Sequence, residues 1–156
     1  MSVTQAPGYA LGHWNLSLAL LSHGDFEAGW REYEWRWHWP EFPEVRRKLP
    51  VRTWRGEDLT GKRILVWAEQ GYGNAIQFAP LARRLLPLAG EVLLEVPTPL
   101  VRLFTASFPD LTVVCRPDVP HALLADPLPD YTIPLMSLSP SNGSTSSLPL
   151  IPGLPI

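Results

Sequence analysis

Glycines and amide side chains are concentrated in one short segment, Glu69–Gln77, with the sequence E-Q-G-Y-G-N-A-I-Q. It follows an apolar run, Arg63–Ala68, typical of a strand that is buried on both faces of a parallel sheet. Gly71 and Gly73 permit a positive φ and a close backbone approach, so the segment could hold a phosphate or a sugar hydroxyl. The side chains that offer hydrogen bonds there are Gln70, Asn74 and Gln77. Ile76 replaces the last glycine of a G-x-G-x-x-G fingerprint, which argues against a dinucleotide site.

A second candidate site is aromatic, because six of the seven tryptophans fall within the first 54 residues. The run W-R-E-Y-E-W-R-W-H-W could bind a protein or another ligand through stacking or cation–π contacts. Its candidate binding residues are Trp30, Trp35 and Trp37. From Phe26 to Trp37, however, an aromatic residue recurs at helical spacing, so packing between helices is the alternative interpretation.

Two helices are expected to position these aromatic side chains. The first is predicted over Leu11–Ser22 and the second over Phe26–Trp37. Gly24 suits the left-handed residue that ends a helix, and Asp25 suits the N-cap of the next one. The sequence therefore predicts a helical hairpin over residues 10–40.

Residues 62–135 alternate between short apolar runs and helical segments. Strands are predicted over Arg63–Ala68, Glu91–Val96, Leu111–Cys115 and Asp130–Pro134. The intervening helices are expected to reach about Leu88 and to span Pro99–Ser107, and Pro80 either bends the first of them or begins it. This alternation predicts right-handed crossovers and a doubly wound parallel sheet, which is the α/β fold class.

Two further segments are expected to lie outside these folded parts. Residues 41–61 read as a linker in which Arg46, Arg47 and Lys48 are solvated rather than part of an anion site. Residues 136–156 form an uncharged tail rich in proline and serine, which favours turns over helix or strand. Within the sheet, Glu95 is expected to face solvent or to cap a helix.

Composition excludes several classes of function. The 13 Lys and Arg against 15 Asp and Glu, a net charge of −2, provide no basic block for nucleic-acid binding. A single cysteine excludes a disulfide scaffold and any multi-cysteine metal site, and no metal or cofactor is expected. No apolar run approaches the roughly 20 residues that span a bilayer, and no secretory signal is recognisable. We therefore expect a cytoplasmic protein without a membrane span.

The chain resembles a bacterial family that joins tetratricopeptide repeats to a glycosyltransferase domain similar to the ADP-heptose:lipopolysaccharide heptosyltransferases. The repeat positions are matched by Leu16, Gly24, Gly29 and Tyr33, with the small Gly29 allowing the helices to approach closely. The segments that carry the resemblance are G-D-F-E-A-G-W-R-E-Y-E-W-R-W, L-T-G-K-R-I-L-V-W-A-E-Q-G-Y-G-N-A-I-Q-F-A, V-L-L-E-V and P-L-M-S-L. They extend from about residue 16 to 152, and E-Q-G-x-G is the most distinctive part.

This resemblance implies a GT-B fold, of which the chain holds the hairpin and the Rossmann-like acceptor half. It implies acceptor-binding roles for Glu69, Gln70, Gly71, Gly73 and Gln77. Asn74 stands where the family has an Asp that acts as general base, and an amide cannot take a proton from a hydroxyl near neutral pH. As an alternative, Asn74 only starts the helix as its N-cap.

Three hypotheses about function follow. The leading one is the acceptor-side half of a nucleotide-sugar-dependent glycosyltransferase, which binds a sugar or glycan acceptor and lacks the donor half that catalysis needs. The second is a non-enzymatic module that binds a protein partner through the aromatic hairpin. The third is a fragment of a longer enzyme with no role of its own.

Overall fold

The structure, a computed structural model, describes residues 4, 6–44, 46–117 and 127–138. The chain divides into two compact units, one formed by the residues through Arg46 and the other by Arg47–Leu138. The first unit is helical and the second contains a parallel sheet with helices, so the fold class is α/β as predicted. Among the described residues, no helix has the length and apolar character that a membrane crossing requires.

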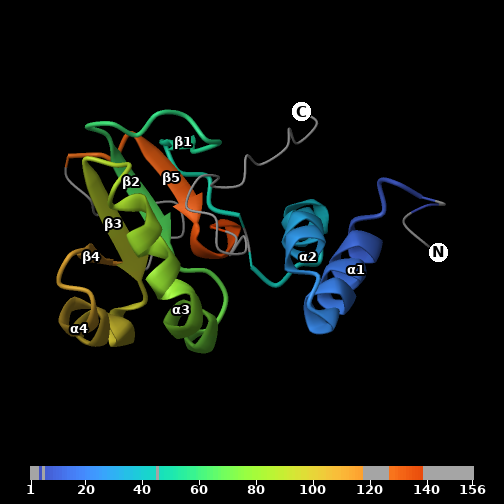
Figure 1. Ribbon diagram of the computed structural model, residues 1–156. Coiled ribbons are helices and arrows are strands. Elements are labelled where there is room, and N and C mark those ends of the chain that lie inside the picture. Colours follow the sequence, from blue (N-terminus) through green and yellow to red (C-terminus); the bar gives the residue numbers. More distant parts are fainter. Residues whose placement is uncertain (1–3, 5, 45, 118–126, 139–156) are drawn as a thin grey trace. The chain divides into compact units, whose positions relative to one another are not determined.

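The first unit is the predicted helical hairpin (Figure 1). Its elements are α1 (Ala10–His23), α2 (Phe26–Tyr33) and the 3-10 helix η1 (Glu34–His38). Gly24 ends α1 in the left-handed conformation, with φ of 89°, and its amide bonds to carbonyls of the last turn. The carboxylate of Asp25 accepts a hydrogen bond from the amide of Ala28 at 3.2 Å. Both capping predictions are therefore confirmed.

The second helix does not continue as an α-helix to Trp37, as the sequence predicts. The carbonyl oxygen of Tyr33, which an α-helix would offer to the amide of residue 37, accepts a hydrogen bond from Arg36 Nη1 at 3.1 Å. The chain tightens into η1 from Glu34 onward. Side-chain competition for this carbonyl gives a physical reason for the change of pitch.

Close packing of the two helices depends on Gly29. A Cβ atom at this position would lie 2.8 Å from Leu21 Cγ and 3.1 Å from the Leu21 backbone nitrogen. Trp30 and Tyr33 are buried beside it, whereas Phe26, in the first turn of α2, is 42% exposed. The close approach predicted for Gly29 is thus confirmed, and the aromatic stripe is buried only in its middle.

The described residues of the second unit form five parallel strands in the order β1-β5-β2-β3-β4. The strands are β1 (Arg52–Thr53), β2 (Arg63–Trp67), β3 (Glu91–Val96), β4 (Thr112–Cys115) and β5 (Tyr131–Pro134). Four of them match the predicted runs to within one residue at each end. The central strands β2 and β3 are buried along nearly their whole length, as expected for parallel strands covered on both faces.

The connections between the strands are α3 (Tyr72–Phe78), the 3-10 helix η2 (Ala79–Leu85), α4 (Thr98–Ser107) and the 3-10 turn η3 (Leu135–Ser137). Figure 1 shows α3 and η2 in front of the sheet, where η2 contacts β3. Pro80 lies in the first turn of η2, so of the two predicted alternatives it begins a helix rather than bending one. This position requires no amide hydrogen from proline.

The predicted boundaries of the second unit are too narrow at both ends. The expected linker 41–61 contains β1, which pairs with β5, and the nearly inaccessible side chains of Trp54 and Leu59. The expected tail 136–156 begins inside the core, because Met136 and Leu138 are buried. Residues 139–156 of that tail lie outside the described residues. The short β1 escapes prediction because two residues carry no periodicity.

Candidate functional site

The strand order places the E-Q-G-Y-G-N segment at the point where the chain reverses its direction of winding. From β2 the chain moves outward through β3 and β4, and β5 then pairs with the opposite edge of β2. The loops that follow β2 and β5 therefore meet at the carboxyl ends of adjacent strands. Ligands of open α/β sheets bind in the crevice at such a switch point.

Glu69 joins these two loops. Its side chain is 1% exposed, and Oε1 accepts a hydrogen bond from the backbone amide of Met136 at 3.0 Å. The carboxylate is therefore buried and holds the loop after β5, and a contact of Glu69 with an acceptor stays a prediction. A buried carboxylate that receives a backbone N–H is a strong structural anchor.

Gln70 and Asn74 form an amide pair directly after this anchor. Asn74 Nδ2 donates to Gln70 Oε1 at 3.0 Å, and Gln70 has a φ of 61°, the only positive value at a non-glycine residue in the described chain. Asn74 Oδ1 has no hydrogen-bond partner among the described residues, so it remains able to bind a ligand hydroxyl. The N-cap of α3 is Gly71, which excludes the alternative that Asn74 caps this helix.

The two glycines of the segment differ from their prediction in conformation. Gly71 has a φ of −83°, and neither Gly71 nor Gly73 belongs to the positive-φ glycines of the described residues. The left-handed residue of this loop is Gln70 instead. Both glycines are exposed, and a Cβ built on either would meet nothing within 4 Å. They therefore leave open space for a ligand, as the binding hypothesis requires, although not through a left-handed turn.

Sequence reasoning missed two exposed side chains on α3. Tyr72 is 53% and Ile76 is 49% exposed, while Gln77 is also exposed and Ala75 is buried. Their i, i+4 spacing places the tyrosine and the isoleucine on one side of the helix. The signal that could have found them is the alanine series at 75, 79 and 82, whose members are all buried and so mark the opposite side as the exposed one.

A buried ion pair lies near the same edge of the sheet. Arg47 Nη1 bonds to Glu95 Oε1, and the two side chains are only 5% and 1% exposed. The Arg47 guanidinium also lies 5.7 Å from the centre of the Trp67 ring, and Arg116 Nε is 3.9 Å from Glu95 Oε1. The predictions that Arg47 is a solvated linker residue and that Glu95 faces solvent or caps a helix are both wrong.

Burial dominates the electrostatics of Glu95. Loss of hydration raises the pKa of its carboxyl, and the neighbouring Arg47 guanidinium opposes this rise. The pair joins a segment before the sheet to β3, 48 positions further along the chain. An acid that lies between apolar residues near the end of a buried strand is the sequence signal for such a partner.

The tryptophans of the hairpin are engaged within their own unit. Trp30 is 8% exposed, so little of its side chain is open to a protein partner, and its predicted role in protein binding is not tested. Trp35 stacks on His13 with a centroid distance of 3.9 Å, and Arg36 lies 4.5 Å above the Trp37 ring. These contacts favour the packing interpretation. Protein binding by Trp35 and Trp37, which are partly exposed, stays a prediction.

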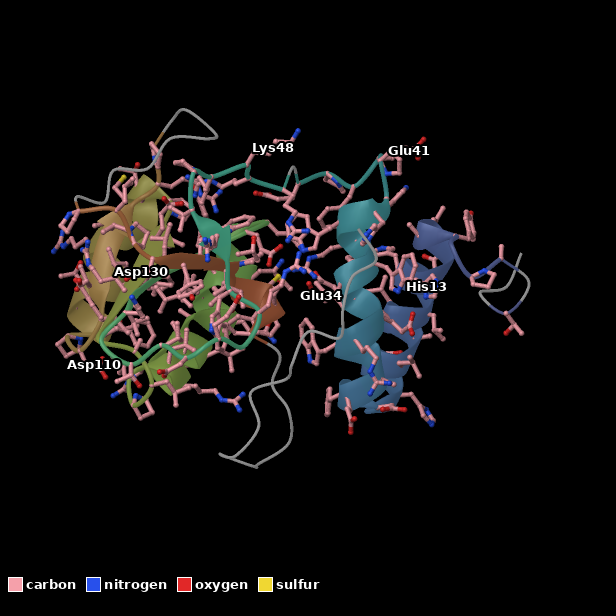
Figure 2. The ribbon with its side chains drawn as sticks, turned by 90° about the horizontal axis from the view of Figure 1, so that it is seen from above. His13, Glu34, Glu41, Lys48, Asp110 and Asp130 are labelled. Carbon is pink, nitrogen blue, oxygen red and sulfur yellow. The ribbon has the colours of Figure 1, made fainter. Side chains whose placement is uncertain are left out.

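His13 of α1, labelled in Figure 2, contacts three other parts of the hairpin unit. Its Nδ1 bonds to the carboxylate of Glu32, and its Nε2 bonds to the carbonyl oxygen of Pro7 at 2.8 Å. With Trp35 stacked on the ring, both nitrogens and one face of the imidazole have a partner. The histidine therefore locks the segment before α1 onto α2. In the described ranges, no group of His, Cys, Asp and Glu side chains could hold a metal ion.

The comparisons with known proteins give one partial match among curated proteins. Over 100 residues, 62% of this chain, the sequence is 32% identical to Protein FlbA of Caulobacter vibrioides (strain ATCC 19089 / CIP 103742 / CB 15). The match covers 17% of the length of that protein. No protein-family profile matches the chain, and no solved structure matches it.

Proposed function

We propose that this chain is the acceptor-side part of a glycosyltransferase-related protein and binds a sugar or glycan acceptor at the segment Gln70–Gln77. The observation that carries this proposal is the amide pair of Gln70 and Asn74 beside two open glycines, at the strand-order reversal of a parallel sheet. Amide groups both donate and accept hydrogen bonds, which suits sugar hydroxyls. We also propose that the protein acts in the cytoplasm.

The same geometry argues that this segment binds rather than catalyses. Asn74 is an amide, and the nearby Glu69 is buried and bonded to a backbone amide, so neither is placed to accept a proton from a solvent-facing hydroxyl. In the GT-B fold implied by the resemblance, the nucleotide-sugar is held by a second Rossmann-like half. Transfer would need that half to hold the donor in line with the acceptor.

The test is a titration of the isotope-labelled full chain with a panel of methyl glycosides and short glycans, followed by amide NMR shifts. We expect saturable shifts of the Gly71–Gln77 amides and weaker binding by Asn74→Ala. Asn15→Ala, which removes an exposed asparagine from α1, serves as the matched control and should bind like the unchanged chain. Absence of any shift in the segment at saturating sugar concentrations contradicts the proposal.

Catalysis has a separate test. Asn74→Asp should raise transfer activity only when a donor-binding half is supplied in trans, because it restores a carboxylate at the family's base position. Equal transfer activity of the unchanged chain and of Asn74→Asp would show that the residue at position 74 is not the general base.

A second candidate function, binding of a protein partner by the hairpin, is favoured by two exposed apolar side chains. Leu18 is 45% and Phe26 is 42% exposed on α1 and α2. Burial of such side chains at an interface is favourable, at roughly 25 cal/mol per Å² of apolar surface. Shifts confined to these helices on addition of a protein partner, with none in Gly71–Gln77 on addition of sugar, would support this function instead.

A further inference from the structure

Helix α3 packs against its own unit through small side chains and turns its large apolar ones outward. Ala75 is 1% exposed, and the alanines that continue the series, Ala79 and Ala82, are fully buried. Tyr72 and Ile76, by contrast, are about half exposed. Folding alone favours the opposite arrangement, because burial of a tyrosine or isoleucine stabilises a fold more than burial of alanine. These two side chains therefore contribute little to the core of the unit.

The exposed side of α3 has an apolar edge, a flat centre and a polar edge. At 3.6 residues per turn, the order around the helix is Tyr72, Ile76, Gly73, Gln77 and Asn74. Gly73 is at the centre, and a Cβ there would meet nothing within 4 Å. The tyrosine ring and the isoleucine thus flank an open floor on one side, and two amides flank it on the other.

The stretch of chain that forms this surface carries no charged side chain of its own. There is no Lys, Arg, Asp or Glu between Gln70 and Ala82, and the acid that precedes this stretch, Glu69, is buried and bonded to Met136. An anionic ligand would lose hydration without gaining a cationic partner from this helix. A ligand that matches the surface is uncharged and has both an apolar face and hydroxyl groups.

A neutral pyranose has these properties, since its C–H groups form an apolar face and its hydroxyls project around the ring. We propose that the exposed side of α3 binds an uncharged pyranose, with the sugar C–H face on Tyr72 and Ile76 and its hydroxyls on Asn74 and Gln77. The inference rests on the proposed function and specifies its substrate class. The site uses side chains along the helix and open space over Gly73, not the amides at the helix start.

The experiment compares neutral and acidic ligands on the full chain. The neutral probes are the methyl glycosides of glucose, galactose and mannose, and the acidic probes are glucuronic acid and glucose 1-phosphate. We expect saturable shifts of the Tyr72 ring and Gly73 amide resonances with at least one neutral glycoside, and binding at least about tenfold weaker for the acidic probes. Equal or tighter binding of an acidic probe overturns the inference, but leaves acceptor binding by the segment intact.

Variants separate stacking from general contact. Tyr72→Ala should weaken neutral-sugar binding about five- to tenfold, because aromatic contact is lost, whereas Tyr72→Phe keeps the ring and should stay within about twofold. Leu103→Ala is the matched control, since Leu103 is a 47% exposed apolar residue on α4. Unchanged sugar binding by Tyr72→Ala overturns this inference but not the proposed function. Failure of every sugar, neutral or acidic, to bind Gly71–Gln77 overturns the proposed function together with it.

A second copy of the chain is the other occupant that an exposed apolar helix side could have. A concentration series without sugar therefore completes the test. Shifts of Tyr72 and Ile76 resonances that grow with protein concentration would show a contact between copies and overturn the sugar assignment. Concentration-independent spectra that respond to neutral glycoside support it.

Discussion

Replacing Arg47 by methionine should destabilise the second unit strongly, because it leaves a charge inside the fold. Glu95 is 1% exposed, and Arg47 is the nearer of its two arginine partners. Removing one member of a buried pair typically costs about 3–5 kcal/mol. Arg116 Nε remains 3.9 Å from the carboxylate, so we expect the lower end of this range. For a unit of this size, about 3 kcal/mol corresponds to a fall in melting temperature of about 12–24 °C.

The loss of stability caused by Arg47→Met should be larger at higher pH, because of the way Glu95 binds its proton. Burial raises the pKa of Glu95 above its ordinary value of 4.5, while Arg47 lowers it. A carboxyl that binds its proton more tightly when folded reduces the free energy of unfolding as pH rises from its ordinary pKa through the raised one. Without Arg47 the raised pKa moves still higher, so this loss of stability extends further upward in pH. Below about pH 4 the proton is bound in both states and only the packing difference remains.

The assay is urea unfolding of the full chain, monitored by tryptophan fluorescence and circular dichroism, at pH 5 and pH 8. Lys48→Met is the matched control, because it makes the same change at an exposed position in the same segment, and it should alter the free energy of unfolding by less than about 0.5 kcal/mol. The double variant Arg47→Met, Glu95→Leu should recover most of the loss, since an apolar pair replaces the ionic one. A cost below about 1 kcal/mol for Arg47→Met, or an equal cost at both pH values, would refute this reasoning.

Three further predictions concern stability. Gly29→Ala should destabilise the hairpin by about 1–3 kcal/mol, because the added methyl group overpacks the contact with Leu21. Gly73→Ala is the matched control: Gly73 is also helical but has open space around it, so the change should be neutral or stabilise by up to about 1 kcal/mol. Thermal melts that rank the two variants in the opposite order would contradict this prediction. Glu32→Ala removes the carboxylate partner of His13 and should lower the free energy of unfolding of the hairpin by about 1–3 kcal/mol, measured by urea unfolding. An unchanged urea midpoint would show that this contact does not stabilise the hairpin. Hydrogen bonding to an arginine lowers the pKa of Glu91 below its ordinary 4.5, so its stabilisation is present above that value and lost as pH falls through the lowered pKa. In Glu91→Gln the free energy of unfolding should therefore fall less steeply as pH is lowered below about 4.5. A pH dependence equal to that of the unchanged chain would contradict this prediction.

Local chemistry explains the parts of the fold that could be predicted. The hairpin turn depends on Gly24 and Asp25, whose capping geometry involves only residues within five positions of each other. The buried strands are recognisable because parallel strands covered on both faces need continuous apolar runs. The segment Glu69–Gln77 follows the carboxyl end of β2, as predicted from the first apolar run, because the end of a strand is set by the strand's own sequence.

Properties that depend on distant partners could not be predicted. Glu95 resembles a surface acid until Arg47 is brought to it from outside the predicted domain. Glu69 resembles a ligand contact until the amide of Met136 reaches it from the loop after β5. In both cases a charge is buried only because another segment satisfies it, and that segment is chosen by the strand order.

By itself, the sequence determined the helical hairpin and four of the five strands that the described residues form. It could do so because helix capping, strand burial and glycine placement are short-range properties. The tertiary structure alone decided that Glu69 is an anchor, that Arg47 belongs to the core, and that Tyr72 and Ile76 face outward. These outcomes follow from packing, because solvent exposure is a property of the neighbours that a side chain acquires, not of its residue type.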